Sequence, residues 1–137
     1  MKVVFDSSAF AKRYIEEPGS QTVDEICQHA DALGLATICT PELFSALNRR
    51  RREGFLSPGD YDLIKTQFSA DVRDAVLLDL TPNVIARAIG LLETNTLRAM
   101  DALHVACAIE WQTDLFVSSD RRQVAAAQNT GLTAQLV

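Results

Sequence analysis

Four acidic residues stand at positions where a carboxylate could take part in chemistry. Asp6 ends the apolar run "VVFD", and Asp120 directly follows the run "LFVSS". Glu42 comes just behind Pro41, and Asp101 lies within the apolar stretch "LRAMDALHVACAI". A carboxylate among apolar neighbours is costly unless it is paired or bound to a cation. Carboxylates gathered at one point suit Mg²⁺ or Mn²⁺, and two such ions can activate a water for phosphodiester hydrolysis.

Each of these acids also has a purely structural interpretation. Asp6, Glu42 and Asp120 each stand near the start of a predicted helix, where a carboxylate can cap the helix and favour its dipole. Arg98, three residues before Asp101, could form an ion pair with it. The four acids together nevertheless indicate a metal site more strongly than any one of them alone.

The elements that must position these acids follow from the hydrophobic pattern. Predicted strands cover residues 2–5, 34–40, 75–80 and 114–119, with a weaker fifth at 133–137. Predicted helices cover residues 7–17, 20–33, 41–54, 57–72, 81–94, 98–112 and 120–131. Nearly continuous apolar strands separated by helices predict a parallel sheet covered on both faces. Such sheets bind ligands at the carboxyl ends of their strands, so Asp6, Glu42 and Asp120 are expected at one edge.

Length and composition limit the class of protein. The chain has 137 residues, of which 47% are hydrophobic and 23% charged, and these values predict one globular domain spanning residues 1–137. No run approaches the roughly 20 apolar residues of a membrane span, and the early acid Asp6 does not suit a secretory signal, so we expect a cytoplasmic protein without a membrane partner. The net charge of −5 disfavours a broadly basic nucleic-acid-coating protein. An acidic metal site surrounded by a few arginines would be consistent with the same net charge.

Four segments, in order and spacing, resemble the successive motifs of PIN-domain ribonucleases, especially VapC-type toxins of toxin–antitoxin pairs. These segments are "FDSSAF", "TPELFSALNR", "LRAMDALHVACAI" and "LFVSSDRRQVAAA". The resemblance implies a three-layer α/β/α PIN-like fold with a central, mostly parallel sheet of four to five strands. It also implies an Mg²⁺- or Mn²⁺-dependent endoribonuclease that hydrolyses RNA, forms homodimers and is neutralised by a cognate antitoxin. We expect that antitoxin to insert an arginine or lysine into the acidic site.

On this resemblance, the acidic metal ligands of the family fall on Asp6, Glu42, Asp101 and Asp120. Ser118 stands two residues before the last acid, where the family often has threonine. Ser8 could either cap the first helix or orient a water or phosphate. Both serines are predicted to support the acids.

Two other polar residues in apolar segments receive structural interpretations. Asp79 lies in "VLLDLTP", where the family pattern has no ligand, and we interpret it as a solvated or hydrogen-bonded acid. His104 lies one turn after Asp101, and a packed histidine is favoured over a general base.

Arginines provide the positive charge that RNA would need. Arg49–Arg52 form a basic run at the end of a predicted helix, which could also be a solvated helix terminus that complements the dipole. The candidates for contact with RNA or antitoxin are Arg49, Arg50, Arg98 and Arg121.

Two alternative functions stay open at this point. A phospho-acceptor receiver or phosphatase-like domain also places an aspartate after its first strand. Phosphatases of that type need a second acid two residues later, where this chain has Ser8, and receivers usually have a lysine after the last strand, which "TAQLV" lacks. A non-catalytic PIN scaffold is the second alternative, and the complete set of acids argues against it.

Overall fold

Five strands form a single parallel sheet in the computed structural model, which describes residues 1–137. The spatial order is β3-β2-β1-β4-β5, and every neighbouring pair is parallel. The strands are β1 (Lys2–Phe5), β2 (Ala32–Ala36), β3 (Val76–Leu78), β4 (Leu115–Ser118) and β5 (Ala134–Leu136). The predicted parallel sheet is therefore confirmed, including its weak fifth strand.

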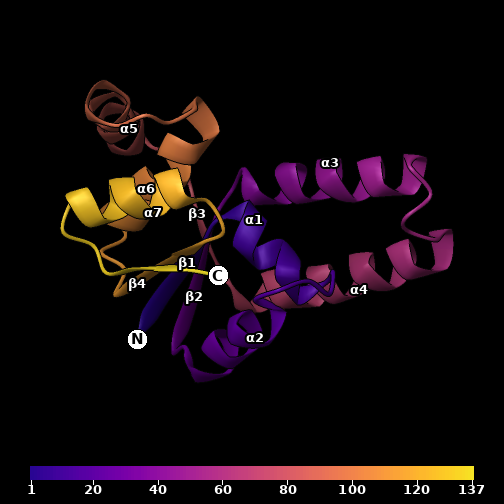
Figure 1. The fold of residues 1–137 in the computed structure, drawn as a ribbon. Coiled ribbons are helices and arrows are strands. Elements are labelled where there is room, and N and C mark those ends of the chain that lie inside the picture. Colours follow the sequence, from indigo (N-terminus) through magenta and orange to yellow (C-terminus); the bar gives the residue numbers. More distant parts are fainter.

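Helices cover both faces of this sheet (Figure 1). They are α1 (Ser7–Phe10), the 3₁₀ helix η1 (Ala11–Arg13), α2 (Ser20–His29), α3 (Cys39–Arg52), α4 (Pro58–Asp74), α5 (Pro82–Thr94), α6 (Ala99–Glu110) and α7 (Arg121–Asn129). No helix combines the length and apolar character required to cross a bilayer.

The alternation of side chains along the strands divides the core into two halves. Val3 and Phe5 of β1 pack into a cluster with residues of α1 to α4, whereas Val4 packs on the opposite face with residues of α5 to α7. Phe116 of β4 joins Val4, and Val117 joins Val3 and Phe5. Because both faces of the sheet are buried, the strands carry apolar residues at nearly every position. The α/β/α arrangement is confirmed.

The order of the strands reverses next to β1. The chain runs from β1 to β2 and β3 on one side, and then returns to place β4 and β5 on the other. At the end of β1, the backbone N–H of Asp6 donates a hydrogen bond to the carbonyl of Val117 at 3.0 Å. Open parallel sheets bind ligands at such a reversal, beyond the carboxyl ends of the strands. The fold therefore places Asp6 at the position where a site is expected.

Several predicted boundaries were wrong. The helix predicted for residues 7–17 is a short α-helix followed by η1, which ends at Arg13. The strand predicted for residues 34–40 occupies Ala32–Ala36, because α3 already begins at Cys39 and so contains Pro41 in its first turn. The preceding helix consequently ends at His29 rather than at residue 33.

Helices α3 and α4 form a hairpin that extends away from the sheet (Figure 1). Gly54 has a φ of +79° in the connection. The Ser57 hydroxyl caps α4 by accepting from the Asp60 N–H at 3.1 Å. Phe44 holds the two helices together through edge contacts with Phe68 and Tyr61, whose ring centroids lie 5.3 and 6.2 Å away. Since α3 starts beside the sheet, Glu42 lies at the base of the hairpin, and the arginine run lies toward its far end.

An ion-pair network ties the chain after α1 to this hairpin. Arg13 donates to both oxygens of Asp71 at 3.0 and 3.3 Å, and the Tyr14 hydroxyl donates to Asp71 at 2.6 Å. A further bond joins Arg13 to Asp24 of α2 at 3.2 Å. Burial acts to raise the pKa of Asp71, but the hydrogen bonds from Arg13 and Tyr14 outweigh it and hold that pKa below its ordinary value. These bonds fix Arg13 and Tyr14 against α4 at the point where η1 ends.

Replacing Asp71 by asparagine is expected to lower the free energy of unfolding by about 1–3 kcal/mol, because the Arg13 guanidinium loses its charged partner. Asp74→Asn is the matched control; Asp74 is exposed on the same helix, and its replacement should change stability by less than about 0.5 kcal/mol. A carboxyl group whose pKa is lower in the folded state than in the unfolded state stabilises the protein at pH values above the unfolded-state pKa. This stabilisation is lost as the pH falls through the folded-state pKa. Urea unfolding should therefore show a difference between wild type and Asp71→Asn that shrinks on acidification. Equal stability of these two proteins at neutral pH would contradict the role given to the network.

Candidate active site

Asp6 is buried at the carboxyl end of β1, with only 1% of its surface exposed. Its Oδ1 caps α1 by accepting from the Ala9 N–H at 2.8 Å, and its Oδ2 accepts from the hydroxyls of Ser8 and Ser118 at 2.7 and 2.8 Å. Burial raises the pKa of the Asp6 carboxyl above its ordinary value, although these hydrogen bonds oppose the shift. Both predicted supporting serines thus contact the same carboxylate oxygen.

Ser118 also connects Asp6 to Asp120. The Ser118 hydroxyl accepts from the Asp120 N–H at 2.9 Å while it donates to Asp6. Asp120 caps α7 by accepting from the Arg122 N–H at 2.8 Å, and its side chain is partly exposed. One hydroxyl therefore fixes the relative positions of two acids from the ends of two adjacent strands.

Glu42 reaches the same region from the first turn of α3. Its Oε1 accepts from the Ser7 hydroxyl at 2.8 Å and lies 2.5 Å from Nε2 of His104. Burial acts to raise the pKa of Glu42, but the hydrogen bond and charge of His104, together with the bond from Ser7, outweigh it and lower that pKa. The carboxylate is consequently held between α1 and α6.

Asp101 lies in the first turn of α6, which begins at Ala99, one residue after the predicted start. Its side chain is partly exposed, so the expectation that apolar neighbours surround it was wrong. Its Oδ2 accepts from the backbone N–H of Arg98 at 3.4 Å, and its Oδ1 accepts from the Gln123 amide at 3.0 Å. Arg98 contributes its backbone and forms no ion pair with Asp101.

Electrostatics connect Asp101 to the other acids. Burial raises the pKa of Asp101, and the negative charges of Asp120 and Glu42 add to this rise. Carboxylates act on each other in this way when they share one region of the structure. Asp101 is therefore repelled by Asp120 and Glu42, and the Ser118 hydroxyl joins Asp120 to Asp6 at the same end of the sheet.

The chemistry of these donors suits a hard divalent cation, which prefers carboxylate oxygens and would relieve the repulsion. No group of three or more His, Cys, Asp or Glu side chains is arranged so that it could hold a metal ion directly. Asp101 and Asp120 are partly exposed, whereas Asp6 is buried and fixed by three hydrogen bonds. Binding of an ion to all four acids would accordingly require the outer carboxylates to move toward Asp6.

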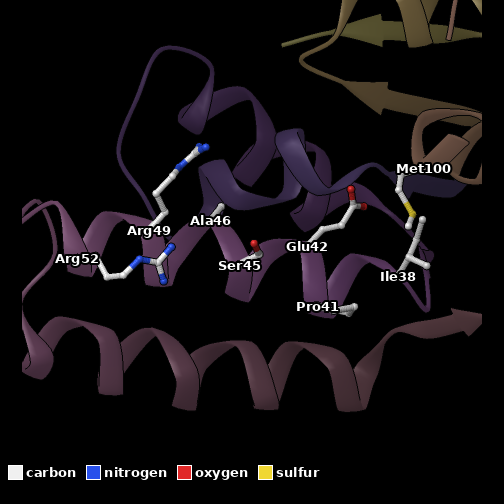
Figure 2. Close-up of a pocket in the computed structure, with 8 residues that line it drawn as sticks. All are labelled: Ile38, Pro41, Glu42, Ser45, Ala46, Arg49, Arg52 and Met100. Atoms are coloured by element: carbon white, nitrogen blue, oxygen red, sulfur yellow. The ribbon is translucent and has the colours of Figure 1, made fainter. Parts of the chain in front are cut away.

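A groove of about 480 Å³ extends from Glu42 along α3 (Figure 2). Its lining residues are Ile38, Pro41, Glu42, Ser45, Ala46, Arg49, Arg52 and Met100. Two members of the arginine run thus share a groove with a predicted metal ligand, whereas Arg50 lies 4.0 Å from Glu17.

The other predicted contact residues lie at helix starts near the acids. Arg98 immediately precedes α6 and Arg121 opens α7, and both are exposed. Asp79 is exposed beyond β3, in agreement with its interpretation as a solvated acid.

Three residues near the acids make polar contacts that the sequence did not predict. Ser7 bridges Glu42 and His104, with its hydroxyl 3.2 Å from His104 Nε2. His104 is buried, as predicted for a packed side chain, but it also contacts Glu42, and its Nδ1 has no partner. Gln123 is buried beside Asp101, and its Oε1 has no partner either. The signals available were the position of Ser7 next to Asp6 and the helical spacing that puts His104 on the same face as Asp101.

Comparison with known families agrees with this geometry. The model of the PIN domain family matches residues 3–129, which include all four acids. The chain belongs to the PIN domain family. A search of curated proteins by sequence finds no match.

Solved structures similar to this PIN domain include several from bacteria. VapC20 of Mycobacterium tuberculosis, a sarcin-ricin loop cleaving toxin, has a TM-score of 0.69 at 15% identity, covering 90% of this chain and 94% of that one. VapBC2 of Rickettsia felis, crystallised with a DNA fragment from its promoter, has a TM-score of 0.70 at 11% identity, covering 100% and 99%. FitAcB of Neisseria gonorrhoeae has a TM-score of 0.66 at 12% identity, covering 96% and 95%. At these identities the likeness establishes the shared fold.

Proposed function

We propose that this PIN domain is a VapC-type toxin, an endoribonuclease that depends on Mg²⁺ or Mn²⁺ and hydrolyses RNA phosphodiester bonds. The observation that carries the proposal is the placement of Asp6, Glu42, Asp101 and Asp120 around the carboxyl end of β1, at the reversal of strand order. The family match and the fold shared with toxins such as VapC20 support it.

In this proposal the four carboxylates would hold the cation, and the neighbouring polar groups orient the carboxylates. A bound Mg²⁺ or Mn²⁺ would neutralise charge at the scissile phosphate and favour ionisation of the attacking water. Ser8 and Ser118 orient Asp6, while Ser7 and His104 orient Glu42. In this proposal water attacks the phosphodiester directly. The hydrolysis therefore has no covalent protein intermediate.

The test is incubation of the purified protein with bacterial total RNA and with single-stranded DNA in the presence of Mg²⁺ or Mn²⁺. Discrete RNA fragments are expected, with the DNA left intact. The matched control is Asp79→Asn, which removes an exposed acid outside the proposed site and should cleave like wild type. Intact RNA in every arm, with a folded protein, would favour the non-catalytic scaffold instead.

A proposed antitoxin restrains this activity by placing an arginine or lysine among the four acids. The mutual repulsion around Asp101 supports this partner, because a cation from a side chain relieves it as a metal ion would. The similar structures include a toxin–antitoxin complex from Klebsiella pneumoniae. Excess Mn²⁺ should partly restore cleavage by a weakened complex, and inhibition that is indifferent to Mn²⁺ would count against this mode of binding.

We also propose that the protein forms a homodimer. Helix α5 carries an exposed apolar stripe of Ile85, Ile89 and Leu92, at 43%, 54% and 40% exposure, and such a stripe is costly in water. Sedimentation equilibrium should give twice the 15.0 kDa mass of the chain, and a monomeric mass at micromolar concentration would exclude the dimer.

A further inference from the structure

The groove beside Glu42 has an ordered arrangement of charge. Glu42, Ser45, Arg49 and Arg52 follow at intervals of three and four residues, so they lie on one face of α3. Figure 2 shows them in sequence along the helix, with Met100 from the start of α6 next to Ile38 at the Glu42 end. At about 1.5 Å of rise per residue, Arg49 lies roughly 10 Å and Arg52 roughly 15 Å from Glu42 along the axis. A line of positive charge therefore leads away from the candidate active site.

The two groove arginines differ from the two between them in what they contact. Arg50 pairs with Glu17 at 4.0 Å, and Arg51 lies over the Tyr61 ring at 4.2 Å and donates to Asn48. The side chains of Arg49 and Arg52 form no ion pair or side-chain hydrogen bond within the protein. Their guanidinium groups are thus free for a ligand, and they are the only basic side chains lining the groove.

We propose that this groove binds the single-stranded RNA on one side of the scissile bond, with successive backbone phosphates contacting Arg49 and Arg52. The inference rests on the proposed nuclease function and deepens it. Ser45 lies between the acid and the arginines and can donate to a phosphate oxygen, and the exposed side chain of Met100 offers an apolar surface for a base near the acids. Grooves that track a single strand combine these same elements, positive charge along the backbone and apolar contact with the bases.

An RNA strand fits these observations better than a protein segment does. The groove begins at a proposed metal ligand. An RNA strand that extends from the reacting phosphate into the groove carries one further phosphate at each nucleotide. Two guanidinium groups in line offer one cation to each of two successive phosphates, and each can bind a phosphate through two hydrogen bonds. The protein has a net charge of −5, so a polyanion is repelled by much of the remaining surface and is guided toward such a stripe.

The test compares Arg49→Gln/Arg52→Gln with the matched control Arg50→Gln/Arg51→Gln, which removes the same charge from the same helix end. The probe is a fluorescein-labelled single-stranded RNA of randomised sequence, and its binding is followed by anisotropy over a range of salt concentrations. Loss of the groove pair should weaken binding by roughly ten- to a hundredfold and reduce the slope of log K against log salt by about 1.4, which corresponds to two phosphate contacts. The control should weaken binding less than about threefold. Thermal melting of both variants establishes that they remain folded.

Three results would overturn the proposal. Equal weakening by both double variants would mean that general charge attraction, rather than the groove, binds RNA. Unchanged binding by the groove variant would show that the groove does not bind RNA. If that variant were also no longer inhibited by a protein partner, the groove would be the binding site of that partner. In each case, cleavage of RNA by the wild-type protein would leave the proposed nuclease function intact. A wild-type protein that neither binds nor cleaves RNA would contradict both the groove proposal and the nuclease function.

Discussion

Replacing Asp6 by asparagine is expected to reduce RNA cleavage at least about a thousandfold while the protein stays folded. A metal ion contributes several kcal/mol of transition-state stabilisation, and about 4 kcal/mol corresponds to three orders of magnitude in rate. Asp6 is the innermost of the four acids and the one fixed by three hydrogen bonds, so its loss removes the ligand around which the proposed site is arranged. Initial rates on a cleaved RNA would measure the effect.

The same replacement should leave stability without metal unchanged or slightly higher. Burial raises the pKa of Asp6, so at neutral pH its ionised form opposes folding, and asparagine removes this charge while it can still accept from the Ala9 N–H. Asp79→Asn serves as the control for both measurements, because Asp79 is exposed and outside the site. Cleavage by Asp6→Asn at the wild-type rate, with contaminating nuclease excluded, would refute the assignment of the acids.

Addition of Mn²⁺ or Mg²⁺ is expected to stabilise the wild-type protein by about 2.7 kcal/mol at a hundredfold excess over Kd, since only the folded chain gathers the four acids. The unfolding transition followed by circular dichroism should shift accordingly with metal concentration. Asp101→Asn should largely abolish the shift, because it removes one of the outer ligands, whereas Asp79→Asn should retain it. A transition temperature that is indifferent to both ions at saturating concentrations would count against a metal site.

The positions of Asp6 and Asp120 could be predicted because they depend on local pattern and one topological rule. Both acids end nearly continuous apolar strands, and parallel strands bring their carboxyl ends to the same edge. The sequence does not specify the order of the strands. Only the structure shows that β1 lies between β2 and β4, where the reversal of strand order creates a site.

The contacts around Glu42 could not be predicted, because they join residues that are distant in the chain. Ser7 and His104 contact Glu42 across separations of 35 and 62 residues. These contacts exist because α1, α3 and α6 meet at the carboxyl edge of the sheet, and this depends on tertiary packing. The local sequence could indicate only that His104 lies on the same helical face as Asp101.

The arginine run illustrates a similar limit. Helical spacing places Arg49 and Arg52 on the same face as Glu42, but only the structure shows that this face lines a groove and that Arg50 faces Glu17. The second strand is another example. It was predicted for residues 34–40, whereas β2 covers Ala32–Ala36 because α3 already begins at Cys39. Such boundaries depend on how the neighbouring segments pack, which a hydrophobic pattern does not encode.

If these acids hold a metal ion that the protein needs to cut RNA, removal of the metal must stop cleavage. Purified wild-type protein, stripped with a chelator, is incubated with bacterial RNA before and after Mn²⁺ or Mg²⁺ is restored in excess of the chelator. We expect no cleavage in the chelator, full cleavage after one or both ions are restored, and no recovery by Asp6→Asn under the same conditions. Cleavage at an undiminished rate in the chelator, or recovery of Asp6→Asn to the wild-type rate, would contradict this expectation.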